Sequence, residues 1–225
     1  MKTCLTASFA ALLLLGTAGP SDAAYVLWTF GSGAFTTTAT DSTFAGTPTF
    51  TRNGSATGGT FHGTGTAYTN PISGTTYTAG FAAYWNGTEA TQNNGFTLSL
   101  NTVDLSDLEF RMDFRSAESG SGSRATAFSA VSYSLDNGNS YTPISGIPAW
   151  GISDNNFNSY SFNLASLDAI ENKSSVLLKF DIPNQNSPGA SANLRLDNLL
   201  VTAVPEPSSF LALAAGGLVL LRRRR

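Results

Sequence analysis

The sequence predicts an all-β protein, an antiparallel β-sandwich of the jelly-roll kind, and three observations support this fold class. Charged residues make up only 12% of the 225 residues, and Thr, Ser, Asn and 22 Gly supply the polarity instead. Such weakly charged, Thr-rich chains are typical of extracellular β-proteins. Short alternations of apolar and polar residues recur between turn signals, and no long helical period interrupts them. About ten short strands spaced in this way are the pattern of a sandwich.

Residues 1–24 form a predicted secretory signal peptide. Lys2 precedes an apolar stretch that ends at Leu15, and a small-residue site ending at Ala24 closes the segment. This order of charged, apolar and small residues is that of a signal peptide, so the export machinery is an expected partner. The single cysteine, Cys4, lies within this segment. The mature protein is therefore expected to have no disulfide and no thiolate-bound metal.

Residues 25–203 form the predicted sandwich domain, and the segment 108–115 is its clearest strand. Apolar residues occupy every second position, and charged residues alternate with them: Leu108, Phe110, Met112 and Phe114 against Glu109, Arg111, Asp113 and Arg115. A period of two predicts a half-buried strand whose charged face is solvated. Similar alternation marks the segments 96–100, 131–135, 160–164 and 176–182. A short helix is expected around residues 165–170, and Trp28 is assigned to the core.

The charge of the domain excludes one class of partner. Between Tyr25 and Val204 there are 7 Lys and Arg against 13 Asp and Glu, which gives a net charge of 7 − 13 = −6. Nucleic-acid-binding domains carry a basic patch or stripe, and none is visible here. No nucleic-acid partner is therefore expected.

The segment 204–225 has the most specific pattern in the chain. The tripeptide Pro205-Glu206-Pro207 is followed by residues 210–221, all apolar or Gly, and then by Arg222, Arg223, Arg224 and Arg225. Two prolines around a glutamate cannot lie inside a helix or donate to a strand ladder, so we expect an extended, accessible tripeptide. Twelve helical residues span about 18 Å, short of the roughly 30 Å hydrocarbon core. Terminal arginines would nevertheless hold such a helix with its end on the cytoplasmic side.

This arrangement resembles the PEP-CTERM sorting signal of Gram-negative bacteria that make exopolysaccharide. In that family a membrane-embedded, thiol-dependent enzyme, exosortase, recognises the tripeptide and removes the tail. The resemblance implies that Pro205, Glu206 and Pro207 are recognition residues. It also implies that residues 210–221 are a transient transmembrane helix and that Arg222 to Arg225 are a stop signal. The segments 27–30, 132–138 and 194–201 also resemble strands of other substrates of this family.

Catalysis has little support in the sequence, and we expect a non-enzyme. The single histidine, His62, lacks the serine elbow of a hydrolase and is interpreted as a surface residue. One dense cluster of carboxylates could serve glycoside hydrolysis: Asp104, Asp107, Glu109 and Asp113. However, Glu109 and Asp113 alternate with arginines on a face expected to be solvated. A secreted glycosidase that uses Asp107 or Glu109 is kept as an alternative.

The segment Ser134-x-Asp136-x-Gly138-x-Ser140-Tyr141 fits the Asp-box pattern of sialidases and other β-proteins. In such boxes the Asp and Ser side chains brace a hairpin turn, so its predicted role is structural. Calcium could use oxygens of residues 136–139 or 154–156, although ordinary Asn/Asp turns explain both segments. No cofactor and no metal are expected.

Two tryptophans, Trp85 and Trp150, are the candidate sugar-binding residues. Each lies beside turn-like residues, where an exposed ring could serve as a platform for a sugar, and core packing is the competing interpretation. They support a second alternative, a carbohydrate-binding module acting on exopolysaccharide.

The sequence predicts, first of all, an exported surface or matrix protein sorted by exosortase. Its expected role is structural or adhesive in the biofilm matrix, where exopolysaccharide is a further expected partner. The C-terminal helix is expected to hold it transiently in the inner membrane before it reaches the cell surface or the extracellular space.

Overall fold

The computed structural model describes residues 23–30, 36–53, 65–86, 95–117, 130–148, 152, 156–182 and 193–206. Most of the predicted signal peptide, His62, Trp150 and all residues from Pro207 onward lie outside these ranges. Within them the chain forms strands, turns and one 3₁₀ helix, η1 (Asp168–Ile170), where the sequence predicted a short helix. No helix in this described part is long and apolar enough to cross a membrane.

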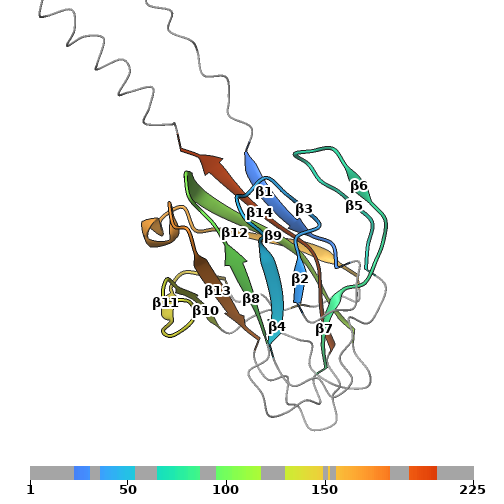
Figure 1. The fold of residues 1–225 in the computed structure, drawn as a ribbon. Helices are drawn as coiled ribbons and strands as arrows, with labels where there is room; N and C mark the ends of the chain where they lie inside the picture. Colours follow the sequence, from blue (N-terminus) through green and yellow to red (C-terminus); the bar gives the residue numbers. More distant parts are fainter. Residues whose placement is uncertain are drawn as a thin grey trace, which may run out of the picture.

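Two six-stranded antiparallel sheets form the body (Figure 1). The first sheet has the order β12 (Asn158–Asn163), β9 (Leu105–Ala117), β14 (Asn193–Pro205), β1 (Ala24–Trp28) and β3 (Asp41–Ser42), and β7 (Ala83–Asn86) also pairs with β14. The second has the order β11 (Thr142–Ile144), β10 (Ala130–Ser134), β13 (Val176–Asp181), β8 (Gly95–Leu100), β4 (Thr49–Asn53) and β2 (Thr36–Thr38). A separate hairpin joins β5 (Tyr68–Thr69) to β6 (Thr76–Tyr77). The antiparallel sandwich is confirmed, and its jelly-roll connectivity stays a prediction.

One aromatic core joins the two sheets. The predicted inward face of β9 is fully buried, from Leu108 to Phe114. Phe180 of the second sheet stacks on Phe96, with ring centroids 4.4 Å apart, and lies 6.0 Å from Phe110 of the first sheet. Such ring contacts add to the burial of apolar area, which is the main stabilising term. Trp28 is buried in the same core, as predicted.

The alternation predicted for residues 131–135 is only partly correct. Val131 is buried and Tyr133 is half-buried, but Leu135 is 45% exposed. β10 ends at Ser134, so Leu135 lies in the following turn and no longer faces the opposite sheet.

The last strand of the chain is central in the first sheet. β14 pairs with β9 on one side and with β1 and β7 on the other. Ala24, the first residue of β1, is opposite Ala203. The start of β1 and the end of β14 therefore lie side by side at one end of the sandwich (Figure 1).

Candidate functional site

The start of the predicted sorting tripeptide still belongs to the sandwich. In β14, Val204 is opposite Ser106 and Pro205 is opposite Leu105. One residue further on, the backbone N–H of Glu206 donates to the carbonyl oxygen of Asp104 at 2.9 Å. We call these contacts between residues 204–206 and 104–106 the motif ladder. Pro205 is extended as predicted, but Pro205 and Glu206 are half-buried rather than fully accessible.

A strained turn supports the motif ladder from the other side. Asp104 and Asp107 both have left-handed backbone angles, with φ of 59° and 52°. The N–H of Asp104 donates to the side-chain oxygen of Asn172 at 3.3 Å, and that of Asp107 donates to Glu171 Oε1 at 2.7 Å. Left-handed residues other than Gly persist where surrounding contacts hold them. Asp104 and Asp107 are two of the carboxylates of the glycosidase alternative, and they lie in the turn before β9 and at a register shift within β9, respectively.

Comparison with known protein families identifies the segment that begins at this ladder. The model of the PEP-CTERM protein-sorting motif matches residues 203–225. This chain carries a PEP-CTERM protein-sorting motif. The motif makes exosortase its sorting partner and implies a secreted, exosortase-processed protein. The match begins at Ala203, the residue opposite Ala24, so the sorting motif starts inside β14.

No curated protein matches the chain. Among solved structures it is similar to the CBM22-1 xylan-binding domain of Paenibacillus barcinonensis Xyn10C, with 14% identity and a TM-score of 0.39 over 81% of this chain and 95% of that one. It is also similar to the K1 cleaved adhesin domain of Lys-gingipain from Porphyromonas gingivalis W83, with 11% identity and a TM-score of 0.33 over 79% and 96% of the two chains. At TM-scores below 0.5, these likenesses assign neither ligand nor role to the PEP-CTERM protein.

Trp85 lies in the core and not on the surface. Its side chain is 2% exposed, and its indole N–H donates to the carbonyl oxygen of Gly95 at 3.2 Å. The guanidinium of Arg52 lies 5.7 Å from the ring centroid. The hypothesis of an exposed sugar platform at Trp85 is therefore wrong, and core packing is correct. Trp150, the other candidate, lies outside the described residues.

The charged face of β9 is not solvated throughout, because it contains a buried acidic pair. Asp113 is directly opposite Asp197 of β14, and the two residues are only 9% and 1% exposed. The expectation of a solvated Asp113 was wrong. Neither Asp197 nor its neighbour Asn198 was predicted as a candidate site residue, although the two polar residues interrupt an apolar strand there.

Hydrogen bonds hold the acidic pair in place. Asp197 accepts the N–H of Thr66 at 2.7 Å and that of Asn198 at 2.9 Å. The amide of Asn198 donates to Asp113 Oδ2 at 2.9 Å, and the hydroxyl of Ser159 donates to Asp113 Oδ1 at 2.5 Å. Burial, together with the charge of Asp113, raises the pKa of Asp197 to about 7 despite the two N–H donors, which act to lower it.

A segment that we call the strap, residues 65–82, covers this pair and the outer face of the first sheet. Tyr68 packs there with Tyr25, Leu27 and Leu200, whose sequence neighbours face the main core. The hydroxyl of Tyr77 in β6 donates to Asp41 Oδ2 at 2.6 Å. Burial and this bond raise the pKa of Tyr77 to about 12. The strap therefore lies over the acidic pair, which includes the Asp113 that the alternating pattern placed in solvent.

The predicted Asp-box turn is confirmed as a structural brace between β10 and β11. Asp136 accepts the hydroxyl protons of Ser140 at 2.6 Å and Ser134 at 2.7 Å, and the N–H of Ser140 at 3.0 Å. These donors lower the pKa of Asp136 to about 2. Both oxygens of this calcium candidate therefore serve the turn. Among the described residues, no group of three or more His, Cys, Asp or Glu side chains could hold a metal ion.

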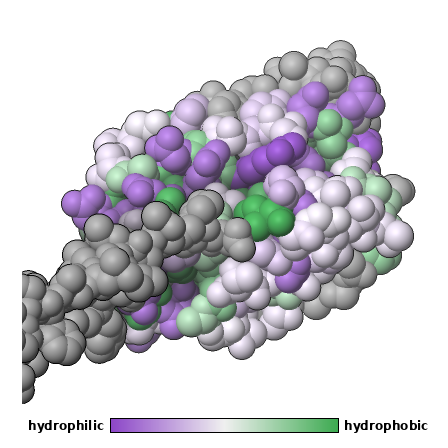
Figure 2. Space-filling view, turned by 90° about the horizontal axis from the view of Figure 1, so that it is seen from above, coloured by the Kyte–Doolittle hydropathy of each residue, from purple (hydrophilic) through white to green (hydrophobic). Residues whose placement is uncertain are grey.

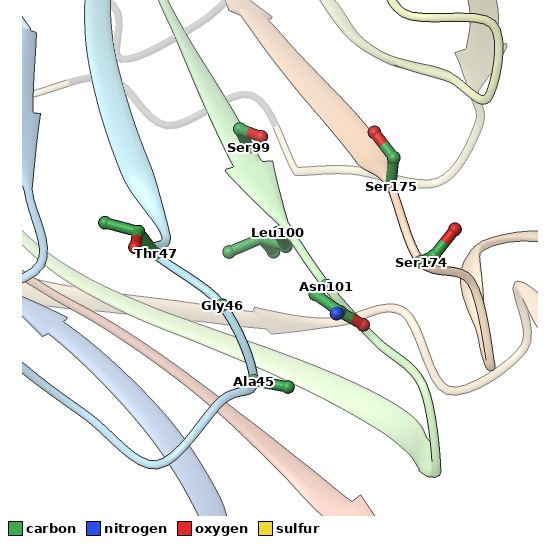
Figure 3. A pocket seen from close by; sticks show the side chains of 8 residues that line it. All are labelled: Ala45, Gly46, Thr47, Ser99, Leu100, Asn101, Ser174 and Ser175. Carbon is green, nitrogen blue, oxygen red and sulfur yellow. The ribbon is translucent and has the colours of Figure 1, made fainter.

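One shallow pocket of about 160 Å³ lies at an end of the second sheet, and the residues that line it are all uncharged (Figure 3). Small-molecule sites are usually larger, roughly 300–1,000 Å³, and contain a few converging polar groups. No charged side chain enters this pocket, so it supports no catalytic assignment. Its lining residues are Ala45, Gly46, Thr47, Ser99, Leu100, Asn101, Ser174 and Ser175.

Proposed function

We propose that this protein is a non-catalytic sandwich that exosortase releases to the cell surface or extracellular matrix, where it has a structural or adhesive role. One observation carries the proposal: every described strand ends at or before Pro205, where the sorting tripeptide begins. Removal of the tail beyond the tripeptide would leave both sheets and the core complete. The sandwich is then the delivered product, and residues 207–225 serve only delivery.

Each part of the two terminal segments has one role in this proposal. The signal peptide directs the chain to the export machinery, and residues 210–221 hold it transiently in the inner membrane. Pro205, Glu206 and Pro207 are read by exosortase, while Arg222 to Arg225 stop the tail at the cytoplasmic side. Since β1 begins beside the end of β14, both apolar segments would leave the sandwich at the same end. No metal, cofactor or catalytic residue of this chain takes part.

The surface at this end carries few exposed apolar side chains among the described residues. Figure 2 looks onto it and shows mainly hydrophilic or neutral residues, with hydrophobic ones in small separate areas of the visible face. Val103 and Val204 are the exposed apolar residues of the motif-ladder region, at 39% and 47% exposure. Isolated exposed apolar residues are normal on soluble proteins.

The intact mass of the protein recovered from its native host tests the proposal. We expect a mass that ends near Pro205 to Ser208, without the apolar tail. The matched variant Glu206→Ala removes only the carboxylate of the tripeptide and should keep the full tail, whereas Glu171→Gln, a change outside it, should be processed. A wild-type mass that still includes Arg225 would contradict the proposed release.

A further inference from the structure

The motif ladder occupies groups that a sorting enzyme would have to engage. The N–H of Glu206 is used by the carbonyl oxygen of Asp104, and Pro205 lies in register with Leu105. The hydroxyl of Ser106 also donates to the carbonyl oxygen of Val204 at 3.4 Å. An enzyme that reads an extended tripeptide needs access to its backbone from several sides. Pro205 and Glu206, while they stay in the motif ladder, have one side occupied by residues 104–105.

A β-bulge in β9 lies directly beside the motif ladder and sets the direction in which the paired strands run there. The register jumps between Thr202, which is opposite Glu109, and Val204, which is opposite Ser106. Asp107 lies in the bulge with φ of 52°, and its N–H is accepted by Glu171 Oε1 at 2.7 Å. Bulges bend the strand that carries them and increase its twist. Glu171 therefore acts on the tripeptide through the bulge and not by direct contact.

The length of chain between the tripeptide and the membrane-bound tail is also short, which leaves the enzyme little room. Three residues separate Glu206 from Phe210, where the apolar tail begins. Three extended residues span at most about 10 Å. With the tail in the membrane, a tripeptide still docked on the sandwich would hold the whole domain close to the bilayer surface, where exosortase must bind. Separation of residues 204–206 from β9 would allow the sandwich to lie further from the bilayer surface.

We propose that the motif ladder is an inhibitory contact, that exosortase acts on chains whose residues 205–206 have separated from β9, and that Ser106 and Glu171 are positioning residues that set how often this separation occurs. The inference rests on the proposed release of the tail by exosortase. It adds that the sandwich itself controls the rate of that release.

A pulse–chase experiment in the native host, read out by intact mass, tests this inference. Ser106→Ala removes the hydroxyl bond to Val204, and Glu171→Ala frees the bulge. Each should speed tail removal roughly two- to tenfold, the factor expected for the loss of one net hydrogen bond. Insertion of Gly-Ser-Gly-Ser after Val204 moves the tripeptide away from the sandwich and should have the largest effect.

Two control variants separate positioning from a general loss of stability. Glu171→Gln keeps an acceptor oxygen for the N–H of Asp107 and should restore the wild-type rate. Ser140→Ala removes a comparable bond in the β10–β11 turn, so it should lower the thermal midpoint without changing processing.

The outcomes distinguish the two proposals. Wild-type protein that keeps Arg225 throughout the chase would overturn the proposed function and this inference with it. Wild type that loses its tail, while the insertion, Ser106→Ala and Glu171→Ala variants are processed at the wild-type rate or more slowly, would overturn only the inhibitory contact.

Discussion

Asp136 and Asp197 have the same side chain, and the fold shifts their pKa values in opposite directions. Asp136 lies in an exposed turn, where two hydroxyls and an N–H lower its pKa to about 2. Asp197 also accepts two N–H groups, yet its pKa is raised to about 7. Both carboxylates have donors, so the number of donors does not explain the difference. The pKa of Asp197 is higher because this carboxylate is buried beneath the strap and faces the charge of Asp113.

The hydrogen bonds of the two carboxylates also differ in their range along the sequence. The bonds of Asp136 reach side chains two to four residues away, whereas the bond from Thr66 to Asp197 crosses 131 residues. A local brace forms once its turn forms. A long-range clamp requires the strap, β9 and β14 to be assembled first, and it then holds that assembly in place.

The largest expected effect is the pH dependence caused by Asp197. Its folded-state pKa of about 7 lies above the ordinary value of 3.8, so folding favours the protonated acid. Its contribution to the free energy of unfolding is complete below about pH 4 and is lost as the pH rises to about 7, a change of about 4 kcal/mol. Urea unfolding of wild type and Asp197→Asn between pH 4 and 8 measures it. If the free energy of unfolding changed with pH by the same amount in the two proteins, the raised pKa of Asp197 would be contradicted.

Replacement of Asp197 by alanine should have the next largest effect. It leaves the N–H groups of Thr66 and Asn198 buried without an acceptor, at a cost of about 3 kcal/mol at pH 5. Because Thr66 begins the strap, hydrogen exchange should increase for the amides of residues 66–77 before those of β8. Equal protection of the strap in mutant and wild type would mean that Asp197 does not hold it.

Gly65 tests how closely the strap approaches Asp197. A Cβ atom at this position would lie 2.3 Å from Asp197 Oδ2 and 2.8 Å from the carbonyl oxygen of Phe81. Backbone and carboxylate must therefore shift in Gly65→Ala, which should cost about 1–3 kcal/mol of unfolding free energy. Gly74→Ala, also in the strap, would have no atom within 4 Å of its Cβ, although its φ of +71° adds strain. A smaller loss for Gly65→Ala than for Gly74→Ala would argue against the close contact.

The smallest effect is expected for Asp136. Its contribution is present above about pH 4 and is lost as the pH falls toward 2, which is the opposite direction from Asp197. Asp136→Ala should lower the thermal midpoint by only a few degrees and speed amide exchange at Ser140. A loss as large as that of Asp197→Ala would show that the turn is coupled to the core.

The sequence alone was sufficient wherever the decisive contacts are local. The two-residue period of β9 predicted the buried face from Leu108 to Phe114, and the Ser134–Ser140 spacing predicted the braced turn. The tripeptide, apolar stretch and arginines predicted the sorting motif that the family model matches at residues 203–225. In each case a single segment of chain contains all the residues that produce the feature.

Only the tertiary structure decided which polar or aromatic residues are covered. Asp113 was predicted to be solvated, and Trp85 was a candidate sugar platform with core packing as the competing interpretation. Both residues are buried, Asp113 beside Asp197 and Trp85 against Phe96. The pattern within one strand cannot reveal a strap from another part of the chain. The same reason explains why the sequence predicted a free tripeptide, whereas Pro205 and Glu206 remain paired with β9. Burial depends on what folds over a residue, and in this protein the covering segments are distant in the sequence.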